Sequence, residues 1–227
     1  MITLTYIYHD CFFLTWPGGS MVFDYWKDPT VENQSSPRFL EGVNLEKPFY
    51  VVVSHHHKDH YVKEIYGWVE RFPNIRYILS KDVAKFARHL LDPESHYSGR
   101  KVAPEKVTVL TPGESYSDET VKIRAFGSTD IGNSYLVEVA RRRVFHGGDL
   151  NAWIWLDEST PEEVKQALED YRKIIEEVRE VSPTIDLCML DVDSRIGRDY
   201  FRGARMLVRS IDVRHFFPMH FALGDEA

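Results

Sequence analysis

Four candidate metal ligands, His55, His57, Asp59 and His60, occur within six residues, in a segment that reads SHHHKDH. Imidazole nitrogens and carboxylate oxygens are ligands of Zn, Mn and Fe, and such an ion activates water for hydrolysis. In an extended segment His55 and His57 point to one side, and His56 points away. Asp59 and His60 fall in the turn that follows. The spacing predicts two neighbouring metal sites, one for each of these pairs; the alternative is a solvated polar loop that merely contains histidines.

The strand predicted directly before the histidine segment would place that segment at the edge of a sheet. The run FYVVV, residues 49–53, is rich in β-branched and aromatic side chains, which predicts a strand buried on both faces. It ends directly before the histidines. Ligand sites of α/β proteins gather at the carboxyl ends of strands, so the position favours a functional site.

The rest of the chain predicts alternating strands and helices. The clearest helix covers 161–181, where Thr160 and Glu163 form a capping box and Pro161 fits the first turn. Further helices are expected over 62–71, 81–91 and 199–211, loops over 24–47 and 92–105, and strands over 2–8, 11–16, 20–24, 76–79, 107–110, 120–126, 134–139, 143–146, 185–190 and 213–217. This order predicts a single α/β domain over residues 1–227.

Composition narrows the class of protein. Hydrophobic residues make up 43% of the 227 residues and charged residues 28%, which excludes a disordered chain. The net charge of −7 argues against unaided binding to nucleic acid. No apolar run reaches the ~18–20 residues of a membrane span, the N-terminus does not read as a signal peptide, and Cys11 and Cys188 cannot build a disulfide framework. We expect a cytoplasmic protein that acts on a small molecule, with neither nucleic-acid nor membrane partners.

The motif HxHxDH, formed by the four ligand candidates above, resembles the signature of the metallo-β-lactamase-fold hydrolases. Three other segments match that family in order and spacing: Asp24 at the end of MVFD, Gly147-Gly148-Asp149, and Pro218-Met219-His220. The opening YIYHDCFFL is similar to the branch that contains the ascorbate-6-phosphate lactonase, with Tyr8 where that branch has a glycine.

This resemblance implies a four-layer αββα sandwich that binds one or two divalent ions, Zn or Mn, or else Fe. Asp149 would bridge two ions, and His220 would complete the second site together with Asp59 and His60. The resemblance also gives Asp59 a catalytic role, in which it orients or deprotonates the attacking water. Asp24 would have a structural role.

One segment departs from the family pattern. The family usually supplies another histidine before the bridging aspartate, but no histidine lies between His96 and His146 here, where the segment reads AFGSTD. Ser128 or Asp130 takes that position. Asp130 could bind a hard ion through oxygen, whereas a neutral serine hydroxyl is a poor ligand. We therefore expect either one metal ion or two with unequal affinity.

Three further residues are candidates for substrate binding, each with a structural alternative. His9 follows a predicted strand and either faces the site or forms a hydrogen bond in the core. Trp153 follows Asp149 and either forms an aromatic wall or packs internally. Arg195 belongs to a group of arginines after Asp191, which either binds a phosphate or carboxylate or forms a solvated surface.

The sequence thus predicts a metal-dependent hydrolase of a small anionic metabolite, with a lactone, ester or phosphoester as substrate. Two alternatives remain open. Asp130 offers the acidic ligand that a di-iron redox protein would need. The missing histidine is the observation in favour of a metal-binding protein with an impaired site and no hydrolase activity.

Overall fold

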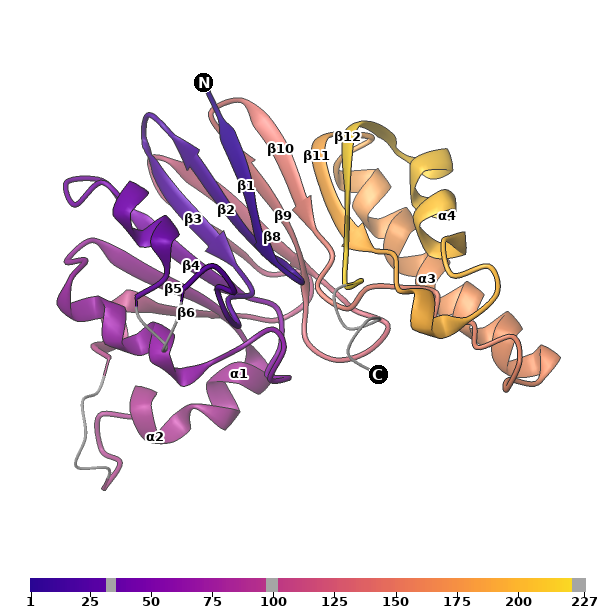
Figure 1. The fold of residues 1–227 in the computed structure, drawn as a ribbon, viewed down its shortest axis with the longest axis horizontal. Coiled ribbons are helices and arrows are strands. Elements are labelled where there is room, and N and C mark those ends of the chain that lie inside the picture. Colours follow the sequence, from indigo (N-terminus) through magenta and orange to yellow (C-terminus); the bar gives the residue numbers. More distant parts are fainter. Residues whose placement is uncertain (32–35, 97–101, 222–227) are drawn as a thin grey trace. The chain divides into compact units, whose positions relative to one another are not determined.

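The structure is a computed structural model that describes residues 1–31, 36–96 and 102–221. The chain comprises two compact units, Met1–Leu110 and Thr111–Ala227, and each unit contains one six-stranded sheet with helical segments packed on it (Figure 1). The α/β class predicted from the sequence is confirmed.

The sheet of the first unit has the strand order β1-β2-β3-β4-β5-β6. Its strands are β1 (Thr3–Tyr8), β2 (Cys11–Trp16), β3 (Gly19–Phe23), β4 (Phe49–Val53), β5 (Ile75–Ser80) and β6 (Val107–Leu110). The first three strands form an antiparallel meander, whereas β3 to β6 run parallel. Because of these directions, β1, β3 and β4 end at the same edge of the sheet.

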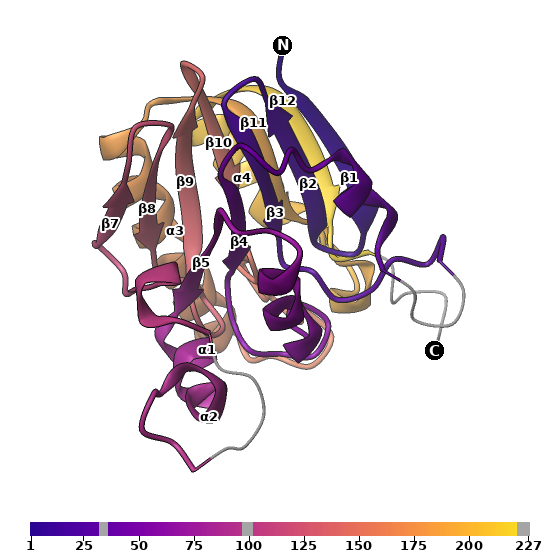
Figure 2. The same ribbon diagram turned by 90° about the vertical axis from the view of Figure 1, so that its left-hand side faces the viewer.

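The sheet of the second unit has the order β12-β11-β10-β9-β8-β7, which can be followed in Figure 2. Its strands are β7 (Ser115–Ser117), β8 (Val121–Phe126), β9 (Ser134–Val139), β10 (Arg142–His146), β11 (Thr184–Asp191) and β12 (Asp212–Met219). Strands β7 to β10 are antiparallel and β10 to β12 are parallel. Strands β8, β10, β11 and β12 therefore end at one edge.

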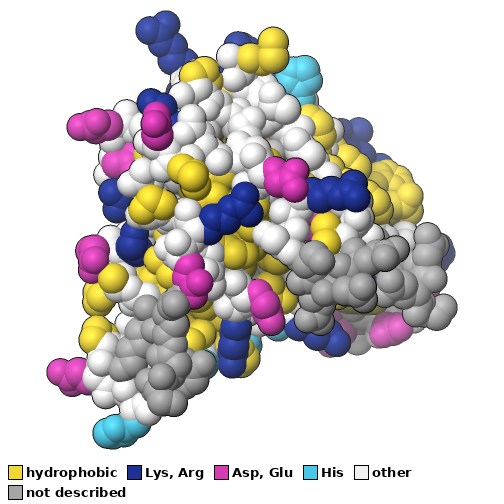
Figure 3. All heavy atoms as spheres, turned by 60° about the vertical axis from the view of Figure 1, so that its left-hand side comes forward, with side chains coloured by type: hydrophobic (Ala, Val, Ile, Leu, Met, Phe, Trp, Pro, Cys, Tyr) yellow, Lys and Arg dark blue, Asp and Glu magenta, His cyan; other side chains and the backbone are white. Residues whose placement is uncertain are grey.

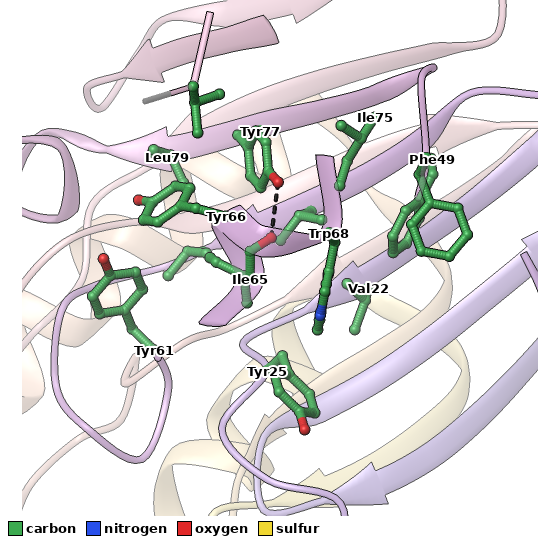
Figure 4. Close-up of a cluster of buried hydrophobic side chains, with 14 of the residues drawn as sticks. Val22, Tyr25, Phe49, Tyr61, Ile65, Tyr66, Trp68, Ile75, Tyr77 and Leu79 are labelled. Atoms are coloured by element: carbon green, nitrogen blue, oxygen red, sulfur yellow. Dashed lines mark hydrogen bonds between the residues drawn. The ribbon is translucent and has the colours of Figure 1, made fainter. Parts of the chain in front are cut away.

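The core of the first unit contains an aromatic layer between the sheet and the helical segment η2 (Lys63–Glu70), drawn in Figure 4. This segment is a 3-10 helix, so the α-helix predicted over 62–71 is wrong in type. Gly67 and the β-branched Ile65 are weak α-helix formers. The carbonyl of Ile65 also accepts a hydrogen bond from the Tyr77 hydroxyl at 2.8 Å, which ties the segment to β5.

Other boundaries in the first unit also differ from the prediction. The helix expected over 81–91 is two short helices, α1 (Lys81–Phe86) and α2 (Arg88–Leu91), because the backbone of the buried Ala87 leaves the helical region at φ −88° and ψ 8°. The predicted loop 24–47 contains a 3-10 segment, η1 (Arg38–Gly42). The predicted loop 92–105 overlaps the 3-10 segment η3 (Pro104–Lys106), and its residues 97–101 lie outside the described residues.

The long helix of the second unit, α3 (Pro161–Val181), has the predicted bounds and the predicted capping box. The amide of Thr160 donates to the Glu163 carboxylate at 2.8 Å, and the amide of Glu163 donates back to the Thr160 hydroxyl at 3.3 Å. The next helix, α4 (Arg202–Ser210), is shorter than predicted because Asp199 has φ 64°, which no right-handed helix permits. Both helices pack on the sheet through one buried cluster that includes Tyr171 and Leu207.

The turn into β3 requires glycine at position 19. A Cβ atom there would lie 2.7 Å from the Pro48 carbonyl oxygen, which already accepts a hydrogen bond from the Ser20 amide. Gly19→Ala is therefore expected to lower the free energy of unfolding by about 1–3 kcal/mol, measured by urea denaturation. Gly67→Ala is the control, because a Cβ at Gly67 meets no atom within 4 Å. Equal midpoints for both variants would contradict the steric account.

Charged side chains of both signs are interspersed with hydrophobic ones on the face shown in Figure 3. Within the described ranges, no helix combines the length and the hydrophobicity that a transmembrane span requires.

Candidate metal-binding residues and comparisons with known proteins

Three loops bring the candidate ligands of the first unit to the edge where β1, β3 and β4 end. His9 and Asp10 form the turn after β1, Asp24 follows β3, and the histidine segment follows β4. The shared direction of these strands thus brings together residues that are far apart in the sequence. The predicted position of the site at the carboxyl end of β4 agrees with this arrangement.

Asp24 is the buried centre of this cluster. Its carboxylate accepts hydrogen bonds from the Ser54 amide at 2.7 Å and from the Ser54 hydroxyl, and it lies 3.0 Å from Nδ1 of His60. The Ser54 hydroxyl in turn lies 2.9 Å from Nδ1 of His55. One carboxylate and one hydroxyl therefore set the ring orientations of two histidines.

The imidazole rings of this cluster lie close to one another, in edge-on and tilted arrangements. The ring centroid of His55 lies 4.1 Å from that of His60 and 4.6 Å from that of His57. His55, His60 and Asp24 are buried and each offers a ligand atom within 4.8 Å of the others, whereas His57 is exposed. A histidine whose Nδ1 is held by a carboxylate binds a metal ion through Nε2. The nitrogen atoms of these histidines thus suit a divalent ion of the Zn, Mn or Fe type.

His9 and Asp59 lie at the same cluster. Nε2 of the buried His9 is 3.5 Å from the Asp59 carboxylate, whose side chain is 20% exposed. The ring centroid of His9 is 5.7 Å from that of His60. The structure thus brings His9 to the ligand candidates, as one of its two sequence interpretations expected.

Asp10 is a further member that the sequence reasoning missed. Its buried carboxylate lies 3.6 Å from Nδ1 of His60 and 3.9 Å from Nε2 of His9. The available signal was its position next to His9 in a turn at a strand end. His56, by contrast, points away as predicted, and its Nδ1 lies 2.9 Å from the Asp82 carboxylate of α1.

The second unit has its own cluster, at the edge where β10, β11 and β12 end. Asp149 follows β10, Asp193 follows β11 and His220 follows β12. Nε2 of His220 lies 3.4 Å from Asp149, and its Nδ1 lies 3.1 Å from Asp193. The buried His220 is thus oriented by one carboxylate so that its other nitrogen faces a second.

Asp193 was not predicted, and it receives the Arg195 side chain. The guanidinium of Arg195 donates to both Asp193 oxygens, at 2.6 and 3.0 Å, and lies 3.2 Å from Nδ1 of His220. Burial alone would raise the pKa of Asp193, but the hydrogen bonds from His220 and Arg195 bring it well below its usual range. Asp193 is therefore a carboxylate that keeps its negative charge next to His220.

Hydrogen bonds with residues close in sequence stabilise the turn that contains Asp149. The amide of Gly148 donates to Nδ1 of the buried His146 at 3.2 Å, and the indole of Trp153 donates to the Asp149 carbonyl at 3.1 Å. The ring of Trp153 lies 6.0 Å from that of His220 and stacks on Trp155. The structure thus places Trp153 against the His220 cluster.

The segment that replaces the expected histidine is tied to the same turn. The Thr129 hydroxyl donates to the Asn151 carbonyl at 2.5 Å and accepts from the Asn151 amide at 3.0 Å. Ser128 accepts a hydrogen bond from the Asp130 amide at 3.2 Å. Carboxylate oxygens of Asp130 and Asp149 lie within 4.8 Å of each other. This geometry favours Asp130 over Ser128 as the surrogate ligand.

For a chain that binds two ions, we expect Asp130→Ala to lower the metal content by one ion per chain, because it removes the candidate oxygen ligand. Ser128→Ala is the matched control and is expected to keep both ions, since its hydroxyl caps a backbone amide. Mass spectrometry on protein purified without a histidine tag or chelator measures both. Loss of an ion in Ser128→Ala alone would reverse the assignment.

Three arginines that follow Arg195 in the sequence are also paired with carboxylates. Arg198 pairs with Asp157 at 2.8 Å, and Arg202 and Arg205 both pair with Asp199, at 3.6 and 3.3 Å.

Backbone strain gathers at both clusters. Four residues with positive φ lie in them, namely His9, Asp24, Trp153 and His220, with φ values between 39° and 64°. Non-glycine residues rarely adopt this conformation, and where they do the surrounding structure must enforce it. Such strain is typical of functional sites.

Comparisons with solved structures agree with this fold. The metallo hydrolase Igni18 from Ignicoccus hospitalis is 13% identical with a TM-score of 0.65, over 96% of this chain and 82% of that chain. A protein from Parabacteroides distasonis classed as a metal-dependent hydrolase is 18% identical with a TM-score of 0.59, over 99% of this chain and 89% of that chain. CmlA, a di-iron β-hydroxylase from Streptomyces venezuelae, is 16% identical with a TM-score of 0.63, over 98% of this chain and 45% of that chain.

A search of the curated proteins finds no match. The family model described as the beta-lactamase superfamily domain matches residues 3–163, which is more than half of the chain. This range contains the HxHxDH motif and the Gly147-Gly148-Asp149 turn. The resemblance found in the sequence is thus confirmed, and the chain belongs to the beta-lactamase superfamily of metallo-β-lactamase fold.

Proposed function

We propose that this protein is a metal-dependent hydrolase. The observation that carries the proposal is a repeated arrangement: in each unit, a buried carboxylate holds Nδ1 of a buried histidine, Asp24 with His60 and Asp193 with His220. Burial of such pairs is costly, and a carboxylate on the far nitrogen is the usual support of a metal-binding histidine.

The proposed ligands are the predicted ones, namely His55, His57, Asp59, His60, Asp130, Asp149 and His220. Their nitrogen and oxygen atoms suit Zn or Mn, and Fe is the next candidate. When bound, a divalent ion in such a set supplies an activated water and polarises the bond to be cleaved. The catalytic base proposed for this water is Asp59, held at 3.5 Å by His9.

A small anionic metabolite is the proposed substrate class, with a lactone, ester or phosphoester bond. A lactone is proposed because the opening strands resemble those of the lactonase branch. A half-buried cation supports the negative charge: Nζ of Lys27 lies 4.5 Å from the ring centroid of Tyr8 and 4.2 Å from that of Trp26. The Trp26 ring in turn lies 5.8 Å from His9. Trp153 and Arg195 remain the proposed substrate contacts of the second unit.

The proposal is tested by hydrolysis of lactones, p-nitrophenyl acetate and bis-p-nitrophenyl phosphate, with protein depleted of metal and then reconstituted with Zn, Mn or Fe. Activity that needs an added ion is expected on at least one of these bond types. Activity that is the same before and after depletion would refute metal dependence.

A di-iron redox function is the second candidate. It is favoured by the acidic Asp130 near Asp149 and by the fold shared with CmlA. Iron-loaded protein with a visible absorbance that bleaches on reduction would support it against the hydrolase. A chain that retains less than one tight ion would favour the third possibility, an impaired site without hydrolase activity.

A further inference from the structure

We propose that a groove between α3 and α4 binds a small molecule that carries several linked phosphate groups. The groove has a volume of about 460 Å³, within the range of small-molecule sites. Its lining residues are Leu168, Arg172, Ile175, Glu176, Arg179, Arg202, Arg205, Met206, Arg209 and Ser210. None of them is a candidate metal ligand, so this proposal is independent of the hydrolase function.

The arginines of the groove form two rows. Arg172 and Arg179 are seven residues apart on α3, and Arg202, Arg205 and Arg209 follow the same helical period on α4. Residues at these spacings share one face of a helix. At 1.5 Å per residue, seven residues extend each row over about 10 Å. The positive charge is therefore spread along the groove, which suits a linear oligophosphate better than a single phosphate ion.

Part of this charge is not neutralised within the protein. Arg202 and Arg205 share Asp199, and Arg205 also lies over the Phe201 ring at 5.1 Å. Arg172, Arg179 and Arg209 make no ion pair with any residue of the described ranges. A guanidinium group binds phosphate oxygens through two parallel hydrogen bonds. Because the whole chain has a net charge of −7, the cluster does not reflect a generally basic surface.

The two helices hold the rows at a defined separation. The hydroxyl of the buried Tyr171 on α3 donates to the Gly203 carbonyl on α4 at 2.9 Å. Leu168, Ile175 and Met206 supply apolar lining between the arginines.

Glu176 is the one carboxylate among the ten lining residues. Removal of its charge should therefore change the binding affinity in the opposite direction from removal of an arginine. In an oligophosphate site its negative charge repels the ligand. Glu176→Gln is therefore expected to tighten binding about two- to threefold, as for removal of an exposed like charge.

The binding experiment titrates inorganic tripolyphosphate into the full-length, metal-loaded protein by calorimetry. The variant Arg172→Gln/Arg179→Gln/Arg209→Gln is expected to weaken binding by about tenfold or more, since it removes several charge-assisted hydrogen bonds. The control is Arg71→Gln/Arg76→Gln/Arg88→Gln, which removes the same charge from exposed positions of the first unit. This control is expected to bind like wild type, and circular dichroism verifies that each variant is folded.

Three results would overturn the proposal. Equal weakening in both triple variants would indicate a general charge effect. An unchanged titration in the groove variant would place the bound tripolyphosphate elsewhere, including on a metal ion. Absence of saturable tripolyphosphate binding by wild type would refute the proposed site. Binding of anionic lipid vesicles or RNA instead would assign the arginines to a different class of partner.

Discussion

His60→Ala is expected to lower the hydrolase activity about a thousandfold and to reduce the bound metal, because His60 is both a proposed ligand and a member of the buried Asp24 network. A thousandfold loss corresponds to ~4 kcal/mol of transition-state stabilisation, the order that a metal ion supplies. The measurements are kcat/KM after reconstitution and metal content by mass spectrometry.

His56→Ala is the matched control for this variant. It removes a histidine from the same segment, but its ring contacts Asp82 on α1 and is 32% exposed. We expect its metal content and kcat/KM to remain near those of wild type. If both histidine variants lost metal to the same extent, the division of the segment into ligands and an outward histidine would be wrong.

Asp193→Ala is expected to lower the affinity for metal about 10- to 100-fold, although Asp193 is not a proposed ligand. The physical reason is that Asp193 fixes Nδ1 of His220 and supplies a negative charge that strengthens the far nitrogen as a donor. Competition with a fluorescent chelator measures the affinity directly. Because the readout is metal affinity, it does not depend on finding the substrate.

Two further variants separate this positioning role from a loss of folding. Asp193→Asn keeps the shape of the side chain and is expected to retain the thermal unfolding midpoint while metal affinity falls. Asp157→Asn removes another aspartate that pairs with an arginine, at an exposed position of the same unit, and is expected to leave metal affinity unchanged. Wild-type affinity in Asp193→Ala would show that His220 needs no such support or binds no metal.

Much of the fold follows from local sequence signals. The bounds of α3 are set by a capping box and by a stripe of apolar residues, both of which are visible in the sequence. Strands β4 and β11 could also be predicted from the sequence, because each is a short apolar run bounded by turn formers. That residues 1–227 form a single domain stays a prediction.

The errors arose where tertiary contacts override local preference. Segment η2 has the apolar spacing of an α-helix, but the Tyr77 hydroxyl occupies the Ile65 carbonyl and the segment is a 3-10 helix. Ala87 is a strong helix former, yet it is buried between two short helices where the chain bends. Strand β7 is a polar tripeptide with no periodic signal, and only its pairing with β8 defines it.

The candidate site residues also differ in how far the sequence alone could predict them. The dense histidine segment could be found because its ligands are neighbours in the sequence. Asp10 and Asp193 were missed, because single aspartates in turns are common and only strand direction brings them to His60 and His220. No sequence pattern reveals the hydrogen bond from the Asp130 amide to the Ser128 hydroxyl, which favours Asp130 over Ser128.

The measurement that tests the central claim most directly is the metal content of wild-type protein, purified without a histidine tag or chelator and then passed through a desalting column. We expect one or two divalent ions per chain, at least one of which withstands the column, with Zn or Mn as the prevailing metal. A chain that retains less than one ion after exposure to Zn, Mn and Fe would contradict the proposal that this protein is a metal-dependent hydrolase.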